Sequence, residues 1–309
     1  MAGDHDHSHR ASASADPGKL ALALGLIVAF MAAEVVVGIL ASSLALLSDA
    51  AHMLTDAAAI ALSLVAVRLA ARPARGVMTY GLGRTEILSA QINGITLLVL
   101  GLLILYEAIR RLVDVPHVDG GPMLATALAG VALNAAVAWI LARANRRSLS
   151  VEGSYQHIVT DLYAFVATAI AAGVILASGF NRADAIASLF VAALMFRAAY
   201  GLVKASGRVF LEAAPQGIDP QEIGMALAAH PGVAEVHDLH VWEVTSGFPS
   251  PSAHVLVESD ADCHGIREQL EQVIDERFGI HHTTLQVEHR KPRLVQMSAP
   301  RPRRQAGGP

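Results

Sequence analysis

Six long apolar runs fill most of the chain between residues 20 and 203, and they limit what it can fold into more than any other feature. Each is close to the ~20 residues that a helix needs to cross the hydrocarbon core of a membrane. Six in succession argue strongly against buried helices in a soluble core. The pattern predicts an all-α transmembrane bundle of six helices, at Leu20–Leu40, Leu44–Leu69, Ile87–Ile109, Met123–Leu141, Ile158–Ala177 and Ala183–Val203.

Composition agrees with a membrane protein. Only 16% of the residues are charged, against roughly a quarter in a soluble domain. The net charge of −4 argues against a nucleic-acid partner. The single cysteine, Cys263, excludes an internal disulfide framework and a cysteine-rich zinc module.

The distribution of Lys and Arg predicts the orientation. The loops at 69–86 and 142–152 carry three arginines each, whereas the 41–43 loop has no basic residue. Cytoplasmic loops are enriched in Lys and Arg. With six spans, both termini are therefore expected in the cytoplasm.

The chain changes character after Pro215. A short helix, two alternating strands, an amphipathic helix and a last strand follow, an αββαβ order typical of a small α+β domain. The predicted elements are 219–229, Val233–Val244, Ser252–Glu258, Gly265–Phe278 and Thr283–Glu288. We expect a His-containing N-terminal tail at 1–19, a transmembrane domain at 20–212, a cytoplasmic domain at 213–289 and a disordered basic tail at 290–309.

The two C-terminal segments have opposite charge. Residues 213–289 hold thirteen Asp and Glu against two arginines, and residues 290–309 hold six basic residues and no acidic one. An acidic domain attracts divalent cations. The basic tail is expected near anionic lipid or the acidic domain.

Two of the apolar spans contain the same polar unit, His-x-x-x-Asp, at His52/Asp56 and His157/Asp161. Residues four apart lie on one face of a helix. Two such faces in opposition supply two nitrogens and two oxygens, a tetrahedral zinc shell. Asp49 lies on the same face and is expected to orient a ligand from outside the shell. The alternative is a buried hydrogen-bonded cluster that holds the bundle together.

A metal site inside the membrane suggests transport. Histidine and carboxylate ligands bind either metal or protons, so zinc binding and protonation can alternate without a nucleotide. The chain has no P-loop motif, and no His-Glu-x-x-His motif of a metallohydrolase. We therefore expect a secondary transporter and no enzyme. The alternative is a membrane-anchored metal sensor or regulator without net transport.

Several motifs resemble the cation diffusion facilitator family of zinc, cobalt and cadmium efflux proteins. They are SLALLSDAAHMLTD at 43–56, YGLGRTEILSA at 80–90, HIVTD at 157–161, ADAIAS at 183–188, LEAAP at 211–215, HDLHVW at 237–242 and TTLQVE at 283–288. The resemblance implies a homodimer, a metallochaperone-like (ferredoxin-like) cytoplasmic domain, and metal/proton antiport by alternating access. It matches His52, Asp56, His157 and Asp161 to the transport site. Zinc is the expected substrate and a candidate regulatory ion, with cobalt and cadmium as alternatives, and no permanently bound cofactor is expected.

The resemblance also implies a cytoplasmic metal site and a charge interlock. The metal site would use His237, His254, His264 and Glu288. Gln286 replaces a family histidine, and His240 or Cys263 would have to substitute. Arg84 and Glu212 match the interlock positions, the alternative being two unrelated interfacial charges.

Two features of other members are missing. Residues 69–83 lack the Asp and His of a second membrane-proximal site, and Ala144–Ser150 lacks a long His-rich insert. The short loops favour a bacterial inner membrane, by resemblance. The only His-rich tract is DHDHSH at residues 4–9, a candidate for weak metal capture or an ordinary polar tail.

Overall fold

A computed structural model describes residues 17–40, 44–146 and 148–290, and it leaves out the side chains of residues 34, 37, 38, 40 and 44–52. The His tract at 4–9 and residues 291–309 of the basic tail lie outside the described residues. The elements are α1 (Pro17–Leu40), α2 (Leu44–Ala70), α3 (Arg84–Val113), α4 (Gly120–Ala142), α5 (Leu149–Ser178), α6 (Arg182–Phe210), α7 (Pro220–Ala228), β1 (Val233–Thr245), β2 (Phe248–Val257), α8 (Cys263–Phe278) and β3 (Thr284–His289).

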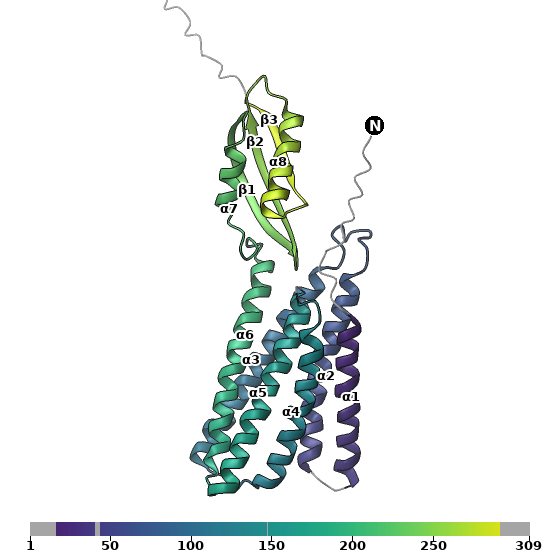
Figure 1. The fold of residues 1–309 in the computed structure, drawn as a ribbon, viewed down its shortest axis with the longest axis vertical. Helices are drawn as coiled ribbons and strands as arrows, with labels where there is room; N and C mark the ends of the chain where they lie inside the picture. Colours follow the sequence, from purple (N-terminus) through teal and green to yellow (C-terminus); the bar gives the residue numbers. More distant parts are fainter. Residues whose placement is uncertain (1–16, 41–43, 147, 291–309) are drawn as a thin grey trace, which may run out of the picture. The chain divides into compact units, whose positions relative to one another are not determined.

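The chain forms two compact units, the first containing α1–α6 together with residues 241–249 at the turn between β1 and β2. Within this unit the six helices run side by side (Figure 1). The most extensive pairings join α3 to α6, α4 to α5 and α1 to α2. Glycines permit the close approach of α3 and α6, since a Cβ at Gly94 or Gly101 would lie 3.0 Å from a side chain of α6.

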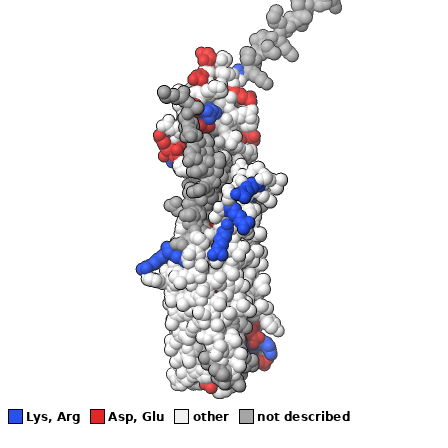
Figure 2. Space-filling view, turned by 90° about the vertical axis from the view of Figure 1, so that its right-hand side faces the viewer, with Lys and Arg blue, Asp and Glu red and all other residues white. Residues whose placement is uncertain are grey.

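The helices present an apolar surface. Among the described residues, α3–α6 and the Met53–Ala70 part of α2 are long and apolar enough to cross a membrane, and α1 offers a shorter apolar stretch at Pro17–Ala33. Large apolar side chains such as Ile170 and Leu103 are at least 60% exposed. The face in Figure 2 shows few charged side chains along the length of the helices. This surface suits lipid, and the protein is an integral membrane protein.

The predicted helices are present, with one informative extension. Helix α5 begins at Leu149, nine residues before the apolar run that predicted it. Its first turns carry Ser150 and Ser154, which are fully buried. Small hydroxyl side chains do not raise hydropathy, so a search for apolar runs misses a helix end that is buried against other helices.

The second unit contains the α+β domain. Its sheet has the order β1-β2-β3, with β2 and β3 parallel and Val255 paired with Val287. Asp219 and Asp262 cap the N-termini of α7 and α8 with their side chains. Its buried apolar side chains are Ile223, Leu227, Ala253, Val255, Val257, Ile266, Leu270, Ile274, Ile280 and Leu285. The αββαβ order predicted from sequence is confirmed.

Candidate metal centre

Three of the predicted transport-site residues meet inside the helical unit. Asp56 of α2 and His157 and Asp161 of α5 are each at most 4% exposed. His157 Nε2 lies 3.0 Å from Asp56 Oδ1 and 3.5 Å from Asp161 Oδ2. One ligand atom from each residue falls within 4.8 Å of the others, and the described residues hold no second group of three or more His, Cys, Asp or Glu that does so.

The distances suit a zinc ion. Ligand atoms about 2.0–2.1 Å from a tetrahedral zinc lie roughly 3.3 Å from each other, between the two measured distances. His157 Nδ1 is buried and lacks a hydrogen-bond partner among the described residues. The three donors, one imidazole and two carboxylates, suit a borderline divalent cation.

The remaining members of the predicted site cannot be placed. His52 and Asp49 belong to α2, but their side chains lie outside the described part of the chain. The predicted fourth ligand and its orienting carboxylate therefore stay predictions.

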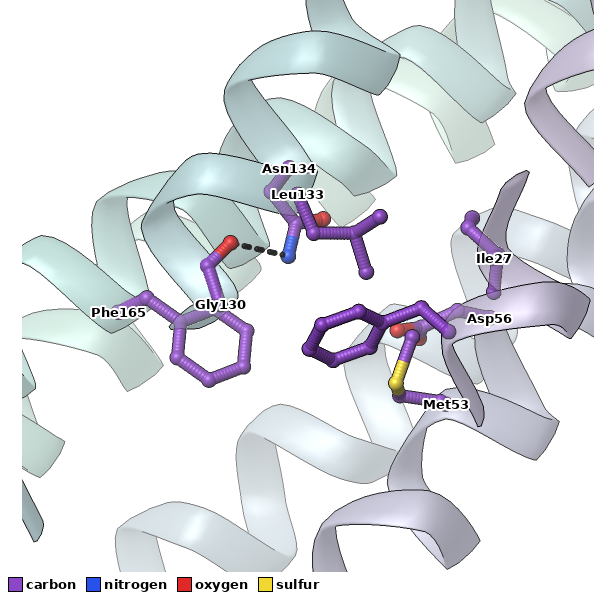
Figure 3. A pocket seen from close by; sticks show the side chains of 8 residues that line it. Ile27, Met53, Asp56, Gly130, Leu133, Asn134 and Phe165 are labelled. Carbon is purple, nitrogen blue, oxygen red and sulfur yellow. Dashed lines mark hydrogen bonds between the residues drawn. The ribbon is translucent and has the colours of Figure 1, made fainter. Parts of the chain in front are cut away.

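A small cavity adjoins Asp56, and Figure 3 shows its lining. Asn134 Nδ2 donates a hydrogen bond to the carbonyl oxygen of Gly130 at 3.1 Å on its wall. The Phe165 ring packs against Gly130, where a Cβ would lie only 2.4 Å from ring atoms. The lining residues are Ile27, Phe30, Met53, Asp56, Gly130, Leu133, Asn134 and Phe165. Apart from Asp56 and Asn134, their side chains are apolar or absent.

A buried polar cluster lies on α2 and α3 and at the start of α5. The sequence pointed to one of its members, Asn93, as a polar side chain inside an apolar span that makes interhelical hydrogen bonds. The single carboxylate of the cluster, Glu86, is 6% exposed and accepts a hydrogen bond from the Ser148 hydroxyl at 2.6 Å. We call this set the serine cluster. Hydrogen bonds link five of its members, Ser63, Ser89, Asn93, Ser150 and Ser154, and the pair of Glu86 and Ser148 lies next to them in sequence on α3 and before α5. Its signals in the sequence are the amide of Asn93 inside an apolar run and the i,i+4 spacing of Ser150 and Ser154 and of Ser89 and Asn93.

The predicted charge pair is present within the first unit. Arg84 Nη2 lies 3.5 Å from Glu212 Oε1, with both side chains about half exposed or more. Arg84 Nε also donates to the carbonyl oxygen of Val244 at 3.1 Å. Nearby, burial raises the pKa of Glu243, an effect partly offset by a hydrogen bond from the Gly247 N–H and by the charge of Arg208.

The cytoplasmic histidines are brought together only in part. The rings of His237 and His254 stack with centroids 5.4 Å apart. Asp238 lies 2.9 Å from His240 Nε2 and 3.8 Å from His254 Nε2. Leu256 pairs with Glu288 in the sheet, two positions beyond the pair of His254 with Gln286. His264 stands at the start of α8. The predicted set of His237, His254, His264 and Glu288 does not form a compact group within the described chain.

Comparisons with known proteins support the reading from the residues. The cation efflux transmembrane domain matches residues 20–211, and the cation efflux protein cytoplasmic domain matches residues 215–290. A solved structure of the metal-bound C-terminal domain of the CzcD transporter from Cupriavidus metallidurans is 35% identical. That match covers 23% of this chain and 99% of the other, with a TM-score of 0.22.

Full-length relatives match nearly the whole chain. The "Cadmium, cobalt and zinc/H(+)-K(+) antiporter" of Bacillus subtilis is 35% identical, over 87% of this chain and 88% of the relative. The "Zinc transporter ZitB" of Escherichia coli is 37% identical, over 88% and 87%. The "Metal cation efflux system protein CzcD" of Cupriavidus metallidurans is 36% identical, over 87% and 86%. This chain is therefore a member of the cation efflux family, the cation diffusion facilitators.

Proposed function

We propose that this protein exports a divalent metal cation, zinc in the first place, and takes up protons in exchange by alternating access. The observation that carries the proposal is the contact of His157 Nε2 with the carboxylates of Asp56 and Asp161, all buried within helices that suit a membrane. Ionisable side chains inside a membrane are costly and commonly mark ion pathways.

The same donors explain proton coupling. A metal binds neutral imidazole and ionised carboxylates, so it competes with protons for all three side chains. Metal arrival releases protons, and protonation from the other side releases the metal. No nucleotide is required by this cycle.

Zinc is the preferred substrate because imidazole and carboxylate together suit borderline cations, with cobalt and cadmium as alternatives. Two of these relatives have names that include zinc, and one of the two names also includes cadmium and cobalt. Relative supply in the cell also decides which ion is carried.

The proposal is tested by zinc flux into reconstituted vesicles. We expect zinc uptake into the vesicles to rise several-fold when the vesicle interior is more acidic than the outside, because protons that leave drive zinc in. This increase should disappear when a protonophore dissipates the pH difference. Movement of zinc without any response to the pH difference would contradict proton exchange. A protein that binds zinc but shows no flux would favour a metal sensor.

We further propose that both termini and the α+β domain are cytoplasmic in a bacterial inner membrane. The arginines of the 69–86 and 142–152 loops support this orientation. A homodimer is part of the same proposal, as is the division into a transmembrane domain at 20–212 and a cytoplasmic domain at 213–289, flanked by tails at 1–19 and 290–309. The family matches at 20–211 and 215–290 lie close to these bounds. Arg84 and Glu212 are proposed to tie the end of α6 to the start of α3.

The cytoplasmic domain is proposed to bind a second zinc ion near His237 and His254. Support comes from two imidazoles and a carboxylate on neighbouring strands. His237 and Asp238 belong to β1, and His254, whose ring stacks on that of His237, belongs to β2. Such an ion would offset repulsion between two acidic domains of a dimer. His264 and Glu288 remain proposed ligands that would have to move or act across the dimer.

Removing these histidines should lower zinc binding outside the membrane site. In the full-length Asp56→Ala/Asp161→Ala protein, we expect His237→Ala with His254→Ala to abolish the residual high-affinity zinc, measured as zinc bound per chain after gel filtration. The exposed His281, which pairs with Asp275, supplies the control as His281→Ala. Residual zinc that survives the double histidine substitution would place the second site elsewhere.

A further inference from the structure

The serine cluster lies between the candidate metal centre and one end of the helices. On α5, Ser154 and Ser150 precede His157, and Ser148 comes just before the helix. On α2, Ser63 follows Asp56 by two turns. With a rise of about 1.5 Å per residue, its members lie roughly 5–14 Å from the metal centre along these helices. All lie on the side of the metal centre where α2 ends and where α3 and α5 begin.

Hydrogen bonds join the cluster across three helices. The Ser154 hydroxyl donates to Ser63 Oγ at 2.7 Å, and Asn93 Nδ2 donates to the same oxygen at 3.2 Å. The Ser150 hydroxyl donates to Ser89 Oγ at 3.1 Å. These direct contacts leave no room for a metal ion between α2, α3 and α5 in this conformation.

On α2, His52 and Asp49 precede Asp56 and so belong to the opposite side of the metal centre, with side chains outside the described part of the chain. The described side chains on that side have a different character from the serine cluster. Met53 and Phe165 lie one turn beyond Asp56 and Asp161, and Phe165 packs on Gly130. Separating apolar surfaces exposes them to water at full cost. Separating hydroxyls exchanges protein hydrogen bonds for water hydrogen bonds, at a small net cost. Judged by the described side chains, the helices therefore part and admit a hydrated cation at a smaller cost on the serine side.

Glu86 lies at the outer end of this polar set and is its only ionisable side chain. Among the described residues, its hydrogen-bond donor is the neutral Ser148 hydroxyl. Arg84, two residues before Glu86, pairs with Glu212, and Arg146, two residues before Ser148, pairs with Glu152. No described Lys, Arg or His forms an ion pair with Glu86. A buried carboxyl group without a charged partner is costly to ionise, so a cation that reached Glu86 would stabilise its carboxylate form.

We propose that the serine cluster is the closed form of the path by which the metal cation reaches Asp56, His157 and Asp161, and that Glu86 is the carboxylate that meets the cation first. This inference rests on the proposed transport function and adds a capture residue and a pathway to it. When α2, α3 and α5 part, the hydroxyls and Asn93 line a hydrated channel. Glu86 then raises the local cation concentration at its mouth.

Thiol labelling tests the pathway. Cys263→Ser gives a cysteine-free parent. In this parent, Ser89→Cys and Ser150→Cys are the test variants. Ala90→Cys and Val151→Cys are the controls, at neighbouring positions that are equally buried. An impermeant cationic methanethiosulfonate is applied to either side of membrane vesicles containing variants that retain zinc flux. We expect the two path cysteines to react at least 10-fold faster than their neighbours, and from one side only. Equal rates within each pair, or labelling from both sides, would overturn the pathway.

Kinetics test Glu86 separately. Glu86→Gln preserves an acceptor for the Ser148 hydroxyl, so a purely structural role predicts unchanged transport. We expect instead a rise of about 10-fold in KM for zinc, with similar maximal flux and unchanged equilibrium zinc affinity. Glu152→Gln is the control: it removes a carboxylate from the first turn of α5, as Glu86→Gln does from the first turn of α3. If the wild type transports zinc and Glu86→Gln has an unaltered KM, Glu86 does not capture the cation. If the wild type shows no zinc flux, the proposed transport function itself is refuted.

Discussion

Asp56→Ala and Asp161→Ala are each expected to reduce zinc flux at least 100-fold. Either change removes one of the two carboxylates that approach His157 Nε2. Substitutions of groups that merely orient metal ligands cost about 10–100-fold in affinity or activity, so removal of a ligand itself should cost at least the upper value. The measurement is zinc flux in vesicles together with zinc affinity by calorimetry.

The control for this prediction is Asp114→Ala, which removes an exposed carboxylate just beyond α3. It should leave both flux and affinity unchanged. Full flux in the Asp56 and Asp161 variants would contradict the site assignment. His52→Ala extends the same assay to the fourth predicted ligand.

A more conservative change separates metal binding from a structural hydrogen-bonded cluster. Asn at position 56 still offers an oxygen to His157 but is a much poorer zinc ligand than a carboxylate. If the cluster only holds α2 to α5, Asp56→Asn retains flux. If it binds the transported ion, Asp56→Asn behaves like Asp56→Ala while the protein stays folded.

Gly130→Ala is expected to produce the largest loss of stability of any single methyl addition in the helical unit. The added Cβ would lie 2.4 Å from atoms of the Phe165 ring, the closest approach found for any glycine in the described chain. Forcing extra volume into a packed interface costs about 1–3 kcal/mol. The loss should appear as a lower midpoint of thermal unfolding in detergent.

The matched comparison is Gly173→Ala, a helical glycine of α5 whose added Cβ meets nothing within 4 Å. There, helix propensity favours alanine and no loss is expected. Phe165→Leu in the Gly130→Ala background should restore stability by making room. Equal unfolding midpoints for the two alanine variants would show that Phe165 does not rest on Gly130. Because Phe165 also borders the cavity beside Asp56, Gly130→Ala should reduce zinc flux as well.

The membrane-spanning helices and the types of metal ligand were predictable because both depend on residues close together in the sequence. Hydropathy over ~20 residues locates a helix that crosses lipid. The i,i+4 spacing of His157 and Asp161 places both side chains on one face of α5 whatever the other helices do. The contact with Asp56 followed from repetition of that unit on a second helix, and the structure bears out the meeting of these three residues.

Other features escaped sequence reasoning for physical reasons. Serine is common on any helix and is nearly neutral in hydropathy, so Ser63, Ser89 and Ser154 stand out only once they are seen to share hydrogen bonds. The predicted cytoplasmic ligands do not form a compact group for a different reason. His254 and Glu288 are strand residues two positions apart in register, while His264 belongs to a helix start. Residues that match the family's metal-binding positions in sequence therefore do not have to meet at one point in the structure.

By itself, the sequence determined that this chain is a six-helix membrane protein with an α+β domain, and which residue types could hold a metal. Those properties depend on hydropathy and periodicity along a single element. The tertiary structure alone decided that Glu86 meets Ser148, 62 residues away, and that Phe165 covers Gly130. Such contacts depend on how each helix is rotated and how deeply it packs against the others, and no local pattern specifies either.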